Sequence, residues 1–355
     1  MIKFAHIGMP KALSSALQEG FFEQHEAMHF LGAGVGSLID YVNDDINITF
    51  ETLIPYASET HYQENKAYYK QAFDQQLDAA RFLGKGCVGV SSEWLGFNFT
   101  PEMADPELKI KRLADLLGAD AHIIFITRNQ RTLLKSLYAE LVKVGYANTY
   151  ADYCAYLWNY RDRSCLQDLC YDVQYERLTR YFHPEHIHVL PLESYRKLDG
   201  SLKENGSQIS LISAICSALN IPYPSNFQLP RVNPSLTEAE LEQKLILNRK
   251  YRHDFGNVLM EPSNRHRSRK QLERNNSIGI ADYFSDVKIK RLLLEMAKSG
   301  ATTVNAQSSD LYVLPRELLY DLEKVFEQSN ARFTEITQMS LYNCDEMATE
   351  TRIVR

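Results

Sequence analysis

A short segment near the start of the chain combines a cation, two hydroxyl groups and a helix start directly after an apolar strand. The turn His6–Ser15 follows that strand and carries Lys11, Ser14 and Ser15. A helix opening near Ala16 adds unpaired backbone N–H groups and the positive end of its dipole, both of which favour an anion. These residue types in this order predict a cradle for a phosphate or phosphosulfate group.

A second cationic position follows another strand. The apolar run His122–Thr127 predicts a buried strand, and Arg128 stands at its end, where the chain turns into a helix with leucines at helical spacing. Ser136 lies one to two turns into that helix, where we expect it to reach the same anion. A guanidinium binds two oxygens of a terminal phosphate at once. The chain therefore offers two anion sites, as a nucleotide phosphorylated at both ends requires.

Together the two segments resemble the nucleotide-binding motifs of the sulfotransferases that use 3′-phosphoadenosine 5′-phosphosulfate (PAPS), of the soluble bacterial or carbohydrate type. Residues Ile7–Gln18 look like the family's 5′-phosphosulfate loop, typically G-x-P-K-[ST]-G-T-T-x-L. Arg128 with Ser136 matches its 3′-phosphate motif. The resemblance covers roughly the first two thirds of the chain, with no match beyond about Leu236. It implies sulfuryl transfer from PAPS to a hydroxyl or amine, releasing adenosine 3′,5′-bisphosphate (PAP).

The resemblance also assigns roles to residues of these segments. It implies that Lys11 contacts the bridging oxygen on which charge develops, and that no metal ion is required. The implied nucleotide-binding residues are Pro10, Lys11, Ala12, Leu13, Ser14, Ser15, Ala16, Arg128 and Ser136, together with Asn233 and Ser235 of a polar loop that also reads as a plain turn. The chain departs from the pattern at Ala12, which replaces a hydroxyl residue, and at Leu13, which replaces a glycine that permits positive φ.

The proton acceptor of the reaction is a separate question. Glu93 is the first candidate, because it lies just past the carboxyl end of the expected second strand, near where an acceptor would bind. A structural role as a cap or ion-pair partner is equally open for this carboxylate. His61 and His6 are the other candidates, although His6 lies inside the first strand, where a packed core histidine is the commoner case.

Two other functions fit a phosphate cradle. A P-loop kinase of a small metabolite also holds phosphates at such a turn, but its pattern places the lysine directly before the hydroxyl, whereas Lys11 stands well before Ser14. A non-catalytic nucleotide-binding module follows if Leu13 has abolished transfer.

The Tyr-rich segments 56–69 and 146–160 suit either an acceptor pocket or a core. The expected partner is a small-molecule or glycan acceptor, and the oligomeric state is left open.

Alternating strands and helices predict an α/β fold, a P-loop-like three-layer domain with a central parallel sheet flanked by helices. Both anion loops fall at carboxyl ends of strands, where such sheets bind ligands. Residues 1–235 are expected to form this core and residues 236–355 a C-terminal helical elaboration packed on it. Strands are expected over residues 3–7, 85–92, 122–127 and 187–192, and helices over 15–30, 61–83, 106–117, 209–219, 238–252 and 286–298, with a basic polar segment at 263–276.

Composition narrows the class of protein. The chain has 355 residues, is 45% hydrophobic and carries a formal net charge of -6, which argues against a nucleic-acid partner. No apolar stretch approaches the ~20 residues that cross a bilayer. The sequence begins without the pattern of a signal peptide, and its six cysteines are scattered. A cytoplasmic protein with reduced thiols and no metal site is expected.

Overall fold

The computed structural model describes residues 1–34, 39–99, 103–197, 202, 210–224, 229–230, 236–250, 294–300 and 310–341. The chain divides into two compact units. The first comprises residues 1–130, 165–232 and 325–355, and the second comprises residues 131–164 and 233–324. The first unit contains the sheet, and the domain boundary expected at residue 235 stays a prediction.

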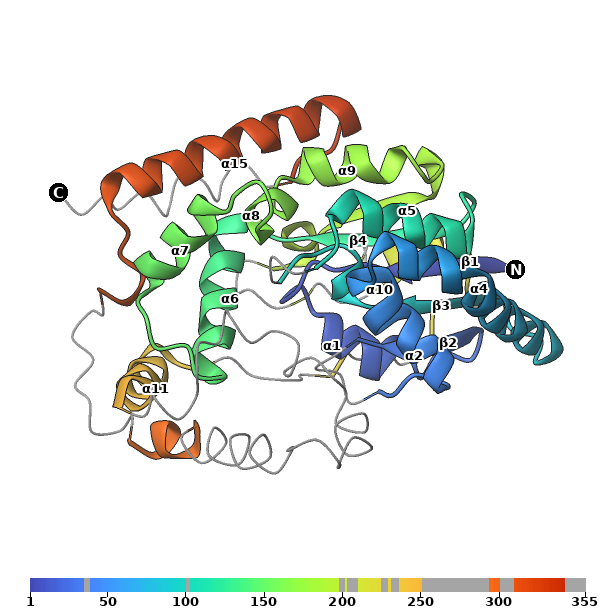
Figure 1. Cartoon of the computed structure of the whole chain (residues 1–355), viewed down its shortest axis with the longest axis horizontal. Helices are drawn as coiled ribbons and strands as arrows, with labels where there is room; N and C mark the ends of the chain where they lie inside the picture. The colour runs from blue at the N-terminus through green and yellow to red at the C-terminus, as the bar shows by residue number, and fades with distance from the viewer. Residues whose placement is uncertain are drawn as a thin grey trace. The chain divides into compact units, whose positions relative to one another are not determined.

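The first unit is built on a parallel sheet with the strand order β2-β3-β1-β4-β5 (Figure 1). The central strand β1 (Ile2–His6) pairs with β3 (Cys87–Ser91) and with β4 (His122–Thr127), while β2 (Met28–Ala33) and β5 (Ile187–Pro191) lie at the edges. The strands are runs of mostly buried apolar residues, as a parallel sheet covered on both faces requires. The predicted P-loop-like α/β fold is confirmed.

Helices flank this sheet. The helix α4 (Glu59–Phe82) packs on β2 and β3, and α10 (Leu211–Ala218) packs on β4 and β5. The helix α5 (Pro106–Leu117) contacts both α4 and α9 (Tyr171–Thr179). Local chemistry sets where α4 begins, because the side chain of Ser58 accepts a hydrogen bond from a backbone N–H of its first turn.

Shorter elements and the helices of the second unit complete the described chain. No helix in these residues is long and apolar enough to span a membrane. Further elements are α2 (Asp44–Ile48), η2 (Thr49–Leu53), α3 (Ile54–Tyr56), η3 (Glu93–Leu95), α6 (Gln130–Lys143), α7 (Tyr150–Asn159), α8 (Cys165–Asp168), η4 (Pro184–His186), η5 (Leu192–Tyr195), α11 (Glu238–Lys250), η8 (Asp310–Tyr312) and α15 (Arg316–Thr337). Residues 294–300 are also helical.

The prediction of one helix over residues 15–30 is wrong. The short helix α1 (Ser14–Leu17) runs into a π-helical turn, η1 (Gln18–Phe22), and the edge strand β2 begins a few residues later. Met28 of β2 pairs with Cys87 of β3. A strand that is defined by a distant pairing partner leaves little trace in local periodicity, which is why the sequence pattern misled here.

His6 is a core residue at the end of β1, and its burial makes stability depend on pH. Its ring is fully buried, with Nδ1 2.7 Å from Ser91 Oγ, and desolvation lowers its pKa from 6.5 to about 3. The folded pKa of His6 is lower than its unfolded pKa, so the neutral buried ring contributes to the free energy of unfolding. This contribution is complete above the unfolded pKa and is lost as the pH falls below it. At about 1.4 kcal/mol per pH unit, we expect His6 to lower the free energy of unfolding by about 2 kcal/mol between pH 6.5 and pH 5.

Urea unfolding at the two pH values measures this effect. The His6→Gln variant carries no titratable ring, so its stability should fall less between pH 6.5 and pH 5 than that of the wild type. Equal losses in the two proteins would show that other groups cause the acid sensitivity.

Candidate functional site

Two non-glycine residues in the loop between β1 and α1 have a positive φ. Lys11 has a φ of 60° and Leu13 a φ of 71°, in the left-handed region that residues with a Cβ seldom adopt. Leu13 is the N-cap residue of α1 and stands where the family pattern has glycine. The loop therefore has the conformation for which glycine is suited, although the glycine is absent.

Side chains of this loop alternate between the core and the surface. Ser14 is buried, and its Oγ lies 3.4 Å from the Met9 carbonyl oxygen. The buried members of the predicted nucleotide-binding set are Pro10, Ala12, Ser14 and Ala16, and the partly exposed ones are Lys11, Leu13 and Ser15. The alternation leaves the ammonium-bearing residue and one hydroxyl residue accessible to a ligand.

At position 13, a glycine variant should be more stable than an alanine variant. We expect Leu13→Gly to be about 1 kcal/mol more stable than Leu13→Ala, because both lose the leucine side chain and only alanine keeps the penalty of a positive φ. Ordinary positions show the opposite order, since glycine has more freedom in the unfolded chain. Urea unfolding of the two variants gives the difference, and an alanine variant as stable as the glycine variant would contradict a strained φ at this position.

Arg128 follows β4, the strand beside β1, and its side chain reaches the loop. Its Nη1 donates a hydrogen bond to the Lys11 carbonyl oxygen at 2.6 Å. Tyr171 holds the backbone of Arg128, because its hydroxyl accepts from the Arg128 N–H at 3.2 Å and donates to the Arg128 carbonyl. Burial, followed by the charge of Arg196, lowers the pKa of Arg128 below its usual range. A second cation therefore lies near Arg128.

Residues just after β5 extend this edge of the sheet. Glu193 Oε1 accepts a hydrogen bond from the Asn129 N–H at 2.6 Å, whereas Glu193 Oε2 is buried and has no hydrogen-bond partner among the described residues. Burial raises the pKa of Glu193, and the charges of Arg128 and Arg196 oppose that rise. Glu193 and Arg196 are not among the residues predicted from the sequence. Their signal was available, since polar residues directly after a buried parallel strand lie at the ligand-binding edge.

Two carboxylate residues lie near the end of β3. Glu93 begins η3 beside the loop, where a Cβ added to Gly8 would stand 3.8 Å from the Glu93 Cα. Glu51 of η2 is a second carboxylate, and its Oε1 accepts hydrogen bonds from the hydroxyls of Tyr41 at 2.6 Å and Ser92 at 3.3 Å. Burial, followed by the charge of Glu51, raises the pKa of Tyr41 well above its usual range. The phenol thus stays protonated and donates to Glu51.

Two further predicted site residues stand on helices. His61 is exposed in the first turn of α4, where its Nδ1 is 3.3 Å from the Asn65 side-chain amide. Ser136 is partly exposed in α6 and belongs to the second unit. Outside the described residues lie Asn233, Ser235 and the basic segment 263–276.

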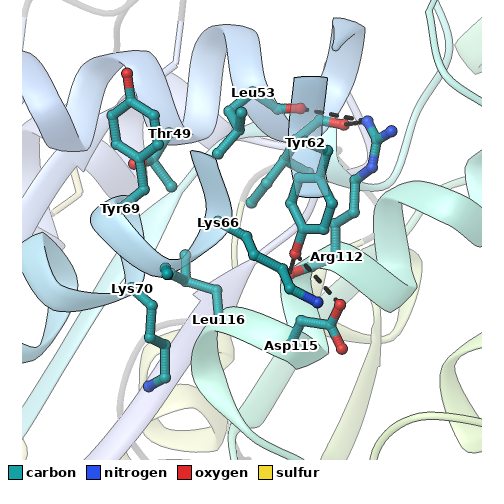
Figure 2. Close-up of a pocket in the computed structure, with 11 residues that line it drawn as sticks. Thr49, Leu53, Tyr62, Lys66, Tyr69, Lys70, Arg112, Asp115 and Leu116 are labelled. Carbon is teal, nitrogen blue, oxygen red and sulfur yellow. Dashed lines mark hydrogen bonds between the residues drawn. The ribbon is translucent and has the colours of Figure 1, made fainter. Parts of the chain in front are cut away.

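A cavity of about 270 Å³ opens between η2, α3, α4 and α5 (Figure 2). Arg112 forms part of its wall, and its Nη1 donates to the Ile54 carbonyl oxygen at 3.0 Å while the guanidinium lies 4.6 Å from the centre of the Tyr62 ring. Its lining residues come from the helices and include none of the predicted nucleotide-binding set. Within the described ranges, no group of three or more His, Cys, Asp or Glu residues is arranged to hold a metal ion.

The fold defines the chain as a P-loop-like α/β protein with cationic residues at the carboxyl ends of β1 and β4. No family model matches the chain, and no curated protein matches it. Among solved structures, the chain is similar to a crystal structure of a sulfotransferase from Alicyclobacillus acidocaldarius, with a TM-score of 0.42 and 17% identity over 70% of this chain and 90% of that chain. A likeness of this degree assigns no function, so function has to be inferred from the site.

Proposed function

We propose that this protein is a sulfotransferase that moves a sulfuryl group from PAPS to a hydroxyl or amine of a small-molecule or glycan acceptor. The observation that carries the proposal is the 2.6 Å hydrogen bond from Arg128 Nη1 to the Lys11 carbonyl oxygen. It brings together two cationic residues that stand far apart in the sequence and that follow neighbouring parallel strands. A nucleotide with phosphate groups at both ends suits two adjacent cationic positions at this edge of the sheet.

The proposed reaction is an in-line transfer. The bond between sulfur and the 5′-phosphate oxygen breaks as the bond between sulfur and the acceptor atom forms. The Lys11 ammonium neutralises the charge that develops on the departing phosphate oxygen, and backbone N–H groups at the start of α1 hold the 5′-phosphate. Adenosine 3′,5′-bisphosphate is the product that leaves.

The acceptor must lose a proton to a nearby base. Glu93 is the first candidate, because its backbone lies beside Gly8 of the loop. Glu51 is the second, although one of its oxygens already accepts from Tyr41 and Ser92. His61 is the third. Substitution of each acid by its amide, Glu93→Gln and Glu51→Gln, separates the first two once an acceptor is known.

Nucleotide binding tests the proposed function. We expect PAP to raise the melting temperature more than ATP with magnesium does, because the site is proposed to bind a phosphate at both ends of the nucleoside. A larger shift with ATP and magnesium would favour the kinase instead. Isothermal titration with PAP then gives the dissociation constant.

The same titration with Arg128→Ala assigns the second anion position. Loss of a charged hydrogen bond should weaken PAP binding by about 1.5 to 3 kcal/mol. The matched control is Arg131→Ala, since Arg131 forms a 3.0 Å ion pair with Glu323 and should leave PAP binding unchanged. An unchanged dissociation constant in Arg128→Ala would reject its role at the 3′-phosphate.

A further inference from the structure

We propose that Lys109, Asp168 and Gln174 act together as a positioning device, which fixes the Glu93–Asn98 turn against the phosphate-binding loop. The inference rests on the proposed function, because the loop and Glu93 are its nucleotide-binding and proton-accepting parts. None of the three side chains is assigned a contact with substrate. They act through the backbone of the turn.

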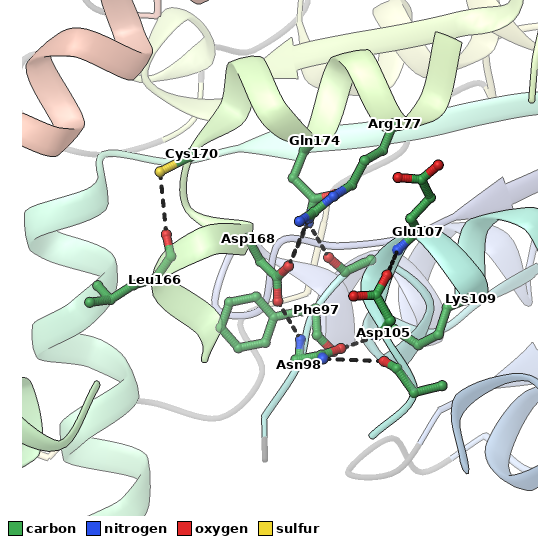
Figure 3. Close-up of polar contacts among 12 residues, drawn as sticks. Phe97, Asn98, Asp105, Glu107, Lys109, Leu166, Asp168, Cys170, Gln174 and Arg177 are labelled. Atoms are coloured by element: carbon green, nitrogen blue, oxygen red, sulfur yellow. Dashed lines mark hydrogen bonds and ion pairs between the residues drawn. The ribbon is translucent and has the colours of Figure 1, made fainter. Parts of the chain in front are cut away.

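The turn is held at four backbone groups by three buried side chains. Figure 3 shows Lys109, Asp168 and Gln174 around Phe97 and Asn98 of the turn. Lys109 Nζ donates to the carbonyl oxygens of Trp94 at 2.6 Å and Phe97 at 3.1 Å. Gln174 Nε2 donates to the Gly96 carbonyl oxygen at 2.6 Å. The Asn98 N–H donates to Asp168 Oδ2 at 2.7 Å. The donors and the acceptor come from α5, α8 and α9, so three elements converge on one short turn.

Burying these charged and polar side chains costs free energy, which indicates that they serve to fix the position of the turn. Lys109 and Asp168 have no exposed surface and Gln174 has 1%. Asp168 also forms a 3.3 Å ion pair with Arg177, and a buried ion pair adds little net stability compared with apolar side chains of similar size. Their hydrogen bonds, in contrast, have narrow requirements of distance and direction, so they define where the turn lies.

The Glu93–Asn98 turn lies close against the phosphate-binding loop. A Cβ added to Gly96 would stand 2.5 Å from the Ile7 carbonyl oxygen, and one added to Gly8 would stand 3.8 Å from the Glu93 Cα. The Ser92 N–H just before the turn donates to the His6 carbonyl oxygen at 3.0 Å. With so little space between them, a displaced turn has to displace the loop as well.

Lys109 also makes the device sensitive to pH. Burial lowers its pKa to about 7, while the charges of Asp168 and Asp105 raise it and that of Arg177 lowers it. A charged donor makes the stronger hydrogen bonds to the two carbonyl groups. The hydrogen bonds from Lys109 to the turn should therefore weaken as the pH rises through neutrality. A variant without the Lys109 amine should lack this pH dependence.

The test compares Lys109→Met with the wild type and with a matched control, Arg180→Met. Arg180 is the C-cap residue of α9 and pairs with Glu107 of α5, so it links the same two helices without touching the turn. We expect Lys109→Met, confirmed as folded by circular dichroism, to bind PAP about tenfold more weakly at pH 6.5, with Arg180→Met within twofold of wild type. The ratio of the two dissociation constants, Lys109→Met over wild type, should shrink between pH 6 and pH 8.5.

Amide hydrogen exchange supplies a second readout that needs no ligand. In Lys109→Met, exchange should accelerate in the turn and also at Ile7 and Met9, whose N–H groups bond to carbonyl groups of Ile124 and Ile126. Faster exchange confined to the turn, or a folded variant that binds PAP as the wild type does at every pH, would overturn the proposal. If Lys109→Met fails to fold, Gln174→Met removes the bond to Gly96 and is measured in the same way. A wild type that does not bind PAP refutes the proposed function, and exchange alone then decides the positioning role.

Discussion

Lys11→Ala should remain folded and lose sulfuryl transfer from PAPS by roughly 10²–10³-fold. Lys11 is proposed to neutralise a charge that appears on the phosphate oxygen only as the bond to sulfur breaks. An interaction of this kind lowers the barrier to transfer and contributes little to ground-state binding. We therefore expect the dissociation constant of PAP to change much less than the turnover number. PAP release from PAPS, with a panel of hydroxyl and amine acceptors, measures the rate.

Lys3→Ala is the matched control for this experiment. Lys3 lies in β1 itself, and its Nζ donates to the Leu117 carbonyl near the end of the strand opposite to the loop. Its loss should leave turnover close to that of the wild type. Lys11→Arg separates charge from geometry, because an arginine keeps the cation but presents it in a different shape. Turnover retained in Lys11→Ala would remove Lys11 from the mechanism.

Elements with local signals could be predicted well from the sequence. The helix expected over residues 106–117 has the bounds of α5, because Asp105 caps its start and Gly118, with a φ of 86°, follows its end. The strand expected over 122–127 coincides with β4, since a short apolar run rich in β-branched residues is typical of a buried strand in a parallel sheet. These two elements place Arg128, which is why its position at a strand end could be predicted.

Features that depend on distant contacts could not be predicted. Glu51 lies in η2, in a region where no helix was expected, and only the fold brings its carboxylate to Ser92. Lys109 looks like any lysine of a charged helix, and its burial depends on the turn after β3 that it contacts. The left-handed conformation of Leu13 could not be predicted either, because glycine, the residue type that usually indicates a positive φ, is replaced by leucine here.

Asp168→Ala should cost about 3–5 kcal/mol of unfolding free energy, the usual loss when one partner of a buried ion pair is removed. Asp168 is fully buried, and its Oδ1 accepts from Arg177 Nη1 at 3.3 Å and from Gln174 Nε2 at 3.2 Å. Burial raises the pKa of Asp168, and the charges of Lys109 and Arg177 oppose that rise. The alanine variant removes the buried counter-charge of Lys109 and Arg177. Urea unfolding at pH 6.5 measures the loss.

The pH dependence of this loss identifies its electrostatic cause. Lys109 has a folded pKa of about 7, below that of an unfolded lysine, so its neutral form is favoured in the core and stability rises with pH above neutrality. Without Asp168 this pKa should fall further, and the deficit of Asp168→Ala should therefore be smaller at pH 8.5 than at pH 6.5. Adding Arg177→Met removes the other uncompensated cation and should restore part of the stability. A deficit that is independent of pH and of Arg177 would instead indicate lost packing and the lost bond to Asn98.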